Sequence, residues 1–494
     1  MKPVNFIFFD MPAPNSFDPL DADNGINLNA MRMLYLTPLE VSLDNKLTST
    51  ILKSFKYDRE NKEISLEVHS DLLFSDGSKI EVNDVVIAIT RMASRRPKFP
   101  VLKDIEGVQE WAKLEAPLKQ LPKGIQVVGQ TIKIHFTKQH SSPLFRFSLE
   151  LFSIIPSRCI DLNSGKMTCA TPPFSGYYAL VKSDAQSLSF KKRTEYKMLQ
   201  YPQDISFIYT SPTQNLFKEY IERDDTVIYG MDLRLKDGTL QDIPQSMHFE
   251  WLPAARFVYL SINPNIKPFN DPLCRVVFME VFRETTKVLF QNHLTLSSSL
   301  FTPIMSGYLK DEELTQMPLS PEQEASCLDR IVHEKIPWHI SDSSNLALSE
   351  KILFDTMKKI APQSKPHITS FSERDSQFLK GENSFYAGSS GFWAEDPIGD
   401  LQMFFTPKLH NSTAFAGHST MLQQQLSELD DASSSLALDL KQINTTLYHE
   451  ALLNVFLHSR RFFAAHNKEL LQSLPQAVSS PAFYQVLKAE SSND

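Results

Sequence analysis

Residues 72–92, LLFSDGSKIEVNDVVIAITRM, constrain the fold of this chain more than any other segment. An apolar run ends in Phe74, and a polar Ser-Asp-Gly turn follows at residues 75–77. An Asp side chain can bond its own backbone in such a turn, and glycine accepts a positive φ. A short extended piece then leads to Asn83, a suitable N-cap for an amphipathic helix. The segment therefore predicts a strand, a turn, a second strand and a capped helix, and every residue in it has a structural explanation.

The length and charge of the chain limit its class. Its 494 residues exceed the ~250–300 at which one hydrophobic core stops growing, so two or three domains are expected. A formal net charge of −8 argues against a nucleic-acid partner. No apolar run approaches the ~18 residues of a membrane span. No signal peptide is recognisable, so either it was removed or the protein is cytosolic, and both readings stay open.

The sequence gives no indication of a metal or a cofactor. There is no CxxC pair, no Cys/His cluster with zinc spacing and no HExxH motif. His449 and His458 are expected in one helix but are nine residues apart, too far to share a face closely. Cys159 and Cys169 are ten apart across a glycine-containing loop, so a local disulfide and two free thiols both remain open.

Hydrophobic periodicity predicts a mixed α/β chain. Strands are expected at residues 6–9, 64–68, 131–136, 188–192, 207–209 and 257–263. Helices are expected at residues 84–94, 272–291, 349–360, 421–428 and 437–457.

Six segments, in this order along the chain, carry a resemblance to a known family. They begin at Asn15 (NSFDPLDADN), Ser49 (STILKSFKYDRENKEISLEV), Leu72 (the opening segment), Pro173 (PFSGYYALVKSDAQSLSFKKRTEY), Arg256 (RFVYLSINPNIKPFNDPLCRVVFMEVF) and Gly391 (GFWAEDPIGDLQMFF). Together they resemble the family 5 extracellular solute-binding proteins, the peptide- and nickel-binding subunits of ABC importers. One departure lies at residues 174–178, where FSGYY replaces the family's Gly-Thr-Gly-Pro-Tyr. A second lies in the Trp-acid segment after Gly391.

The resemblance implies an α/β, bilobed fold of the periplasmic-binding-protein type II kind with an additional inserted domain, three domains in all with mixed sheets. Domain I would be a discontinuous lobe made of residues 1–39, 170–256 and 465–494. Domain II, the inserted domain, would span residues 40–169. Domain III, the second lobe, would span residues 257–464.

The resemblance also implies a function. The protein would capture a peptide between two closing lobes and deliver it to the membrane permease subunits of an ABC importer. It would act as a monomer without a cofactor, in the periplasm or anchored outside the membrane. A cytoplasmic location is the alternative.

The segment after Gly391 holds the first candidates for ligand binding. A buried peptide amine is costly unless a carboxylate pairs with it. The resemblance and the spacing from Gly391 give that role to Glu395, with Asp396 as the second choice. Phe392 and Trp393 would form aromatic walls beside the ligand, and core packing is the alternative for either ring.

Two further segments complete the candidate site. Asp23, Asn24 and Gly25 follow an Asp-Pro turn and lie where the family's loop lines the cleft; a plain Asn-Gly turn is the alternative. Tyr259 and Asn263 lie on a strand that could pair with the peptide backbone. Packing is the more favoured role for Tyr259.

Other classes of function remain as rivals. The chain has no GxSxG elbow, no phosphate-binding glycine loop and no Rossmann fingerprint, so an enzyme is not expected. A triad assembled from distant residues stays open. The fold could instead be the ligand-sensing domain of a cytosolic regulator, or an interaction module that has lost ligand binding.

Overall fold

The computed structural model divides into two compact units. The first unit comprises Met1–Met231, Thr239–Pro253 and Arg461–Asp494, and the second comprises Asp232–Gly238 and Ala254–Arg460. The predicted further boundary inside the first unit, between domains I and II, stays a prediction.

The structure describes residues 3–487 except 10–12, 15, 22–24, 45, 70, 141, 197–200, 211–214, 232–242, 245, 253–255, 290–294, 304, 315–318, 342–347, 370, 392–397, 399–400, 402–403, 406–419, 430–434 and 473–482. Among these residues, no helix combines the length and the apolar character that a membrane span requires.

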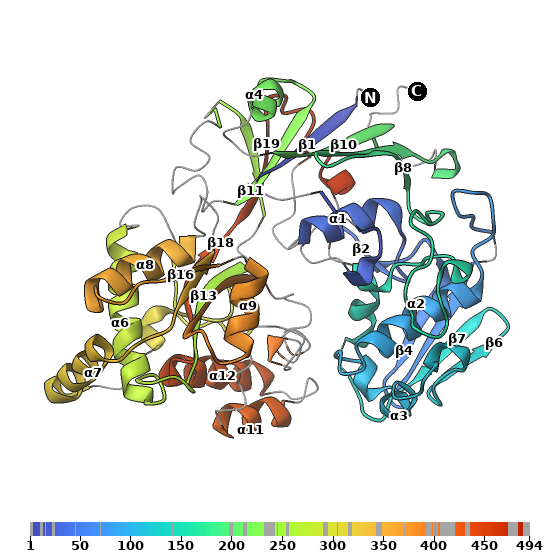
Figure 1. The fold of residues 1–494 in the computed structure, drawn as a ribbon. Helices are drawn as coiled ribbons and strands as arrows, with labels where there is room; N and C mark the ends of the chain where they lie inside the picture. The colour runs from blue at the N-terminus through green and yellow to red at the C-terminus, as the bar shows by residue number, and fades with distance from the viewer. Residues whose placement is uncertain are drawn as a thin grey trace. The chain divides into compact units, whose positions relative to one another are not determined.

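A mixed seven-stranded sheet forms the centre of the first unit, in the order β12-β19-β11-β1-β10-β9-β8. Its strands are β1 (Val4–Phe9), β8 (Tyr178–Ser183), β9 (Ser187–Lys192), β10 (Asp204–Thr210), β11 (Thr226–Met231), β12 (His248–Trp251) and β19 (Arg461–Ala465). The central strand β1 is parallel to both of its neighbours, and the other pairs are antiparallel (Figure 1). Phe6, Ile7 and Phe8 are fully buried, as expected for a central strand with an unbroken apolar run.

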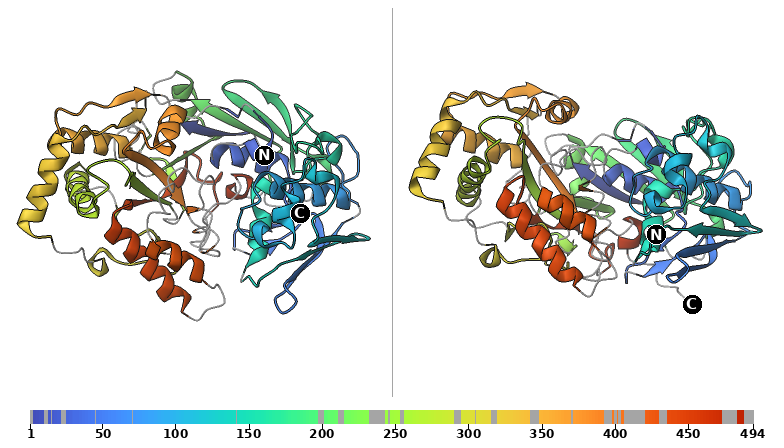
Figure 2. Two further views of the ribbon diagram at one scale, coloured as in Figure 1. Left: turned by 60° about the horizontal axis from the view of Figure 1, so that its bottom comes forward. Right: turned by 90° about the horizontal axis from the view of Figure 1, so that it is seen from below.

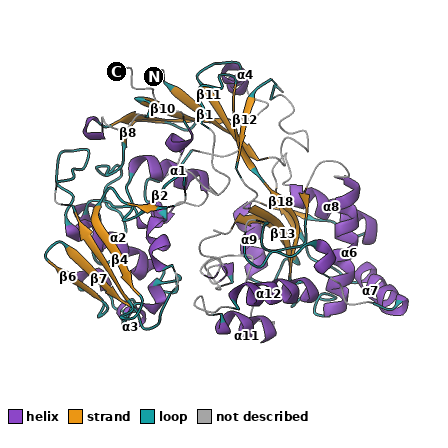
Figure 3. Ribbon diagram, turned by 180° about the vertical axis from the view of Figure 1, so that it is seen from behind, coloured by secondary structure: helices purple, strands orange, loops and turns teal. Residues whose placement is uncertain are grey.

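A separate antiparallel sheet, in the order β4-β5-β7-β6, lies in the middle of the first unit's sequence. Its strands are β4 (Leu52–Asp58), β5 (Glu63–Val68), β6 (Ile125–Val128) and β7 (Thr131–His135). Side chains of β5 alternate between buried and partly buried, the pattern of a strand with one covered face. The helix α2 (Val82–Arg95) packs against β7 (Figure 3).

The remaining elements of the first unit are short. They include α1 (Gly25–Leu34), β2 (Glu40–Val41), β3 (Leu47–Thr48), α3 (Val108–Trp111), α4 (Asn215–Ile221), the 3-10 helix η11 (Phe483–Val486) and several further 3-10 turns.

The predicted N-cap of α2 is wrong by two residues. The helix begins at Val82, so Glu81 is the N-cap and Asn83 lies inside the first turn. A carboxylate oxygen of Asp84 accepts a hydrogen bond from the Glu81 N–H at 2.8 Å, and the other accepts from Ser157 N–H at 2.7 Å. Asp84 therefore supplies the capping that the sequence analysis assigned to Asn83.

A four-stranded antiparallel sheet, in the order β14-β18-β13-β17, forms the centre of the second unit. Its strands are β13 (Arg256–Ile262), β14 (Thr295–Leu296), β17 (Phe385–Gly391) and β18 (Leu453–Ser459). The two-stranded parallel sheet of β15 (His339–Ser341) and β16 (His367–Thr369) lies apart from it. The helices are α6 (Pro272–Leu289), α7 (Pro321–His333), α8 (Leu348–Ile360), α9 (Phe371–Leu379), α11 (Thr420–Glu428) and α12 (Leu436–Glu450).

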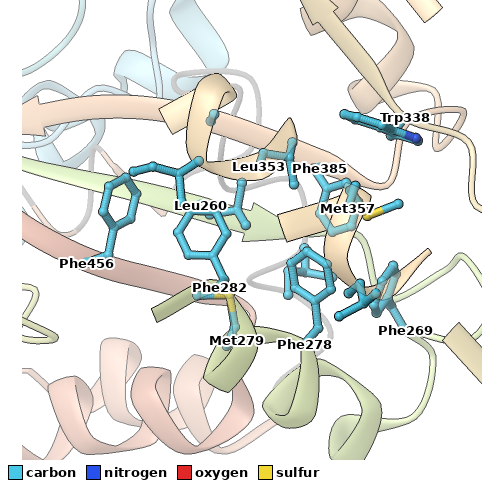
Figure 4. Packing of buried hydrophobic residues seen from close by; sticks show 14 of the residues in the cluster. Leu260, Phe269, Phe278, Met279, Phe282, Trp338, Leu353, Met357, Phe385 and Phe456 are labelled. Carbon is cyan, nitrogen blue, oxygen red and sulfur yellow. The ribbon is translucent and has the colours of Figure 1, made fainter. Parts of the chain in front are cut away.

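Both faces of β13 are buried, because its side chains alternate between two hydrophobic clusters. Val258, Leu260 and Ile262 join the cluster formed with α6, α7 and α8, part of which is shown in Figure 4. Phe257 and Tyr259 join the cluster formed with α11 and α12. Gold α7 and yellow-green α6 pack together in that first helix layer (Figure 2). The predicted mixed α/β class is confirmed.

The helix predicted at residues 437–457 is wrong in its second half. The helix α12 ends at Glu450, because Ala451 adopts a left-handed conformation with φ 49°. All seven residues of β18, from Leu453, are buried, and all but Phe456, which lies at a bulge, pair with β13 or β14. Tertiary pairing therefore overrides the apolar run's helical reading, and His449 and His458 lie in different elements.

Candidate functional site

The predicted ligand-binding segment follows an outer strand of the second unit. Gly391 is the last residue of β17 and pairs with Arg256 at the start of β13. The guanidinium of Arg256 donates a hydrogen bond to the Ser389 hydroxyl at 3.0 Å, which ties β17 to β13 near this end. Phe392, Trp393, Glu395 and Asp396 lie outside the described residues, so their roles in ligand binding stay predictions.

Tyr259 lies beneath β17 in the hydrophobic core. Its side chain is 1% exposed and contacts the rings of Tyr386 and Phe404. Its hydroxyl lies 2.8 Å from the place where a Cβ would stand on Gly388, so only a glycine lets the ring lie this close to β17. These contacts support packing, the role already favoured for Tyr259; a ligand contact stays a prediction.

Asn263 immediately follows β13 and is fully buried. Its amide donates a hydrogen bond to the Asn383 carbonyl oxygen at 3.1 Å, and its side-chain oxygen accepts one from Asn265 N–H at 2.9 Å. The side chain therefore holds two backbone segments together.

The expectation that β13 pairs with a peptide backbone needs correction. β13 is hydrogen-bonded on both sides, to β17 and to β18, along its length. A third strand has no backbone groups to bond there. Within the described strands, the outer members of this sheet are β17 and β14.

The predicted N-terminal loop is anchored to α2 in the first unit. Asp18 is 2% exposed; one carboxylate oxygen caps the turn by accepting from Leu20 N–H at 3.0 Å, and the other pairs with Arg91. Asp23 and Asn24 lie outside the described residues, and Gly25 is the first residue of α1. The ion pair is not visible in the local sequence pattern, because its partners are 73 residues apart.

The segments that begin at Leu72 and Pro173 are hydrogen-bonded directly to each other. Ser75 N–H donates to the Phe174 carbonyl oxygen, and Phe174 N–H donates to the Ser75 hydroxyl, both at 2.9 Å. The buried guanidinium of Arg193 donates to the carbonyl oxygens of Phe174, Gly176 and Leu73 at 2.9, 3.1 and 2.6 Å. The two segments thus form one scaffold, stabilised by hydrogen bonds that leave the carbonyl groups satisfied.

The polar turn at residues 75–77 also has a structural role. Gly77 has φ +83°, which favours glycine. The Asp76 carboxylate accepts from the Ser78 N–H and hydroxyl at 3.0 and 2.6 Å, and it pairs with Arg158. These hydrogen bonds, the Ser78 hydroxyl first, lower the pKa of Asp76.

A partly buried polar cluster surrounds Glu40 in the first unit. The Tyr177 hydroxyl lies 2.9 Å from both carboxylate oxygens of Glu40 and 2.7 Å from the Thr50 hydroxyl. Burial raises the pKa of Glu40, and the two hydroxyl groups lower it by a smaller amount. The rings of Tyr196 and Tyr484 pack against Tyr177. The only sequence signal for this cluster was the tyrosine at position 177, where the family has proline.

Two disulfides are present in the structure. One joins Cys159 to Cys169, and the other joins Cys274 of α6 to Cys327 of α7. With Asp271, the second pair is the one group of three or more metal-ligand side chains found among the described residues. Its sulfur atoms are bonded to each other, while Asp271 caps α6 through Leu273 N–H at 3.0 Å, so the group serves the scaffold.

Comparison with known proteins places this fold in a known group. The sequence model of "Bacterial extracellular solute-binding proteins, family 5 Middle" matches residues 46–329, more than half of the chain. No curated protein matches the sequence.

Solved structures match over nearly the whole chain. The pheromone receptor PrgZ, described with its mode of peptide binding, has a TM-score of 0.76 at 15% identity and covers 99% of both chains. Haemophilus influenzae OppA in complex with RPPGFSPFR has a TM-score of 0.74 at 14% identity and covers 99% of both chains. NikA from Brucella suis in complex with Fe(III)-EDTA has a TM-score of 0.74 at 15% identity, covering 98% of this chain and all of the other. At these identities the matches establish the fold alone.

Proposed function

Because the chain belongs to the bacterial extracellular solute-binding proteins, family 5, and therefore serves ABC import, we propose that its ligand is a peptide. The proposed protein captures the peptide outside the cytoplasm and delivers it to the permease subunits of the importer. Binding of the ligand favours the transport-competent state only by its higher affinity for that state.

The observation that carries the proposal is the position of β17 at the edge of its sheet. Among the described strands, β17 has β13 as its one neighbour, and it runs directly into Gly391 and the Trp-acid segment. An outer strand offers backbone N–H and C=O groups at the regular spacing that an extended peptide can use. An acid just beyond that strand suits the terminal amine of such a peptide.

The names of matched structures also favour peptides over other ligands. A dipeptide-binding protein from Pseudoalteromonas sp. SM9913 is described in complex with Met-Leu, and Helicobacter pylori DppA with the peptide STSA. A smaller number name other ligands, as AgaA does with agropinic acid. The ligand class is therefore to be decided by experiment.

The first test identifies what the protein carries. Molecules that co-purify with the protein are released from it and identified by mass spectrometry. Peptides are expected. A thermal shift with defined peptides must accompany them, because a ligand of the native state raises stability. The peptide proposal is refuted if the released molecule is agropinic acid, another opine or nickel. It is also refuted if no peptide pool shifts the melting temperature, and that result would favour an interaction module.

The second test addresses the amine-binding acid. Wild type should bind a peptide with a free amino terminus more tightly than its acetylated form, and Glu395→Ala should lose this preference. Removing one partner of a buried charge pair costs about 2–5 kcal/mol, a weakening of ~30-fold or more for the free-amine peptide. Asp396→Asn is the matched control and should keep the preference. An unchanged preference in Glu395→Ala rejects the role of Glu395.

A further inference from the structure

Two histidines lie side by side on the small parallel sheet of the second unit. β15 reads His-Ile-Ser and β16 reads His-Ile-Thr, and the register places His339 opposite His367. Register-paired residues of adjacent strands point to the same face of a sheet. The two imidazole rings accordingly stack, with centroids 5.0 Å apart and an angle of 27° between the ring planes.

Two carboxylates act electrostatically on His339. Burial and the neighbouring His367 lower the pKa of His339, while Glu373 and Glu382 act in the opposite direction. Glu373 lies on α9, which packs against β15, and Glu382 follows that helix. His367 and Glu382 are exposed and His339 is partly exposed, so solvent reaches the pair.

The same sheet holds two polar atoms that are shielded from solvent and lack a partner among the described residues. They are Nδ1 of His339 and the hydroxyl oxygen of Thr369. Thr369 is two residues from His367 on the same strand, so it faces the same side as the histidines. Buried polar atoms in native proteins normally have a hydrogen-bond partner or a ligand.

The spacing of the rings suits a shared metal ion. A zinc–nitrogen bond is about 2.0–2.1 Å, which puts the ion roughly 3.2 Å from each ring centroid. A tetrahedral angle at the ion then requires centroids about 5.2 Å apart, close to the observed 5.0 Å. Side-chain rotation, which the exposed position of His367 allows, has to turn one nitrogen of each ring toward the ion.

We propose that His339 and His367 form a two-histidine surface site for a divalent transition-metal ion of the Zn²⁺ class, with water completing the shell. Imidazole is a preferred ligand of Zn²⁺, Ni²⁺ and Cu²⁺. The site lies within the second unit and does not depend on which solute the protein carries.

The test is titration of the intact protein with ZnCl₂ in a buffer that does not bind metal, followed by calorimetry at pH 7.5. Wild type should show a site that His339→Ala and His367→Ala each weaken by at least tenfold. Loss of a supporting partner of a metal ligand already costs roughly 10–100-fold, and loss of a ligand costs no less.

Two exposed histidines with one carboxylate each are matched controls. His333 lies 3.1 Å from Asp329, and His248 lies 2.9 Å from Glu250. Substituting either by alanine should leave the zinc affinity unchanged. Circular dichroism checks that each variant is folded, and His367→Gln gives a second variant at the more exposed position. Equal zinc affinity in wild type, His339→Ala and His367→Ala, or no zinc binding by wild type, overturns the proposal.

Discussion

Tyr177→Phe is the change that best tests the polar cluster around Glu40. It removes one hydroxyl from a side chain that is 8% exposed and leaves the ring contacts in place. The carboxylate of Glu40 then loses the donor that lies 2.9 Å from both of its oxygens and keeps its hydrogen bonds with Thr50. The variant therefore removes the hydroxyl's hydrogen bonds with Glu40 and Thr50 and leaves the packing of the ring unchanged.

The decrease in the free energy of unfolding that Tyr177→Phe should cause depends on the charge of Glu40. A hydrogen bond to a charged group contributes about 1.5–3 kcal/mol, and one between neutral groups contributes about 0.5–1.5 kcal/mol. The loss should therefore be about 2 kcal/mol where the carboxyl is ionised and about half of that where it is protonated, so it should grow as pH rises. For a unit of about 280 residues, 2 kcal/mol lowers Tm by roughly 3–4 °C.

The pH dependence has a definite sign. Burial raises the pKa of Glu40 in the folded state, so folding makes this carboxyl bind its proton more tightly. The stability that results is fully present below the ordinary pKa of a glutamic acid and is lost as pH rises through the folded pKa. Tyr177→Phe raises that folded pKa further, because the lost donor favoured the ionised form. The variant should therefore be more sensitive to rising pH than wild type.

Urea unfolding at pH 4 and pH 7.5 measures the effect, with Tyr201→Phe as control. Tyr201 belongs to the same aromatic cluster, 4.9 Å from Tyr484, but its hydroxyl has no hydrogen bond to a described residue. Tyr201→Phe should change the free energy of unfolding little at either pH. An equal loss at both pH values, or a loss no larger than that of Tyr201→Phe, refutes the reasoning.

Two further predictions concern stability. Glu350→Gln breaks the ion pair with Arg374, whose side chains are 1% and 2% exposed, and should lower the free energy of unfolding in urea by about 3–5 kcal/mol. A decrease below about 1 kcal/mol, the level expected for the exposed pair Lys287–Glu284 of α6, contradicts this prediction. Cys274 and Cys327 are separated by 53 residues in the sequence, and replacing both by serine should lower the free energy of unfolding by about 4 kcal/mol. The same change at Cys159 and Cys169, separated by 10 residues, should lower it by about 3 kcal/mol. Thermal melting of the two double-serine variants compares them, and the reverse order would contradict the loop-entropy argument.

The elements predicted from local patterns are present in the structure, apart from the second half of the helix expected at residues 437–457, and that error has a physical origin. β5 and β7 alternate along the chain, and the structure has them as strands. β18 was assigned to a helix because a short, continuously apolar run reads equally as buried strand or buried helix. Its partner β13 lies almost 200 residues earlier, so the pairing that decides between them is invisible to a local pattern.

Long-range contacts account for what the sequence analysis missed in the sites. Tyr177 and Glu40 are separated by 137 residues, and His339 and His367 meet only because two strands pair in register. The one histidine pair weighed from the sequence, His449 and His458, was expected within a single helix. By contrast, the Ser-Asp-Gly turn is closed by neighbouring residues, and its structural role was predictable.

The tyrosine at position 177 bears on whether this chain has kept its ligand. Its departure from the family's proline was one reason to consider a fold that has lost binding. The structure gives that tyrosine a separate task, since its hydroxyl is engaged by Glu40 and Thr50 and its ring packs against Tyr196 and Tyr484. A change that is explained by the stability of the first unit carries no information about the ligand. The argument for lost binding then rests on the Trp-acid segment alone, and the paired peptides with free and acetylated termini test that segment directly.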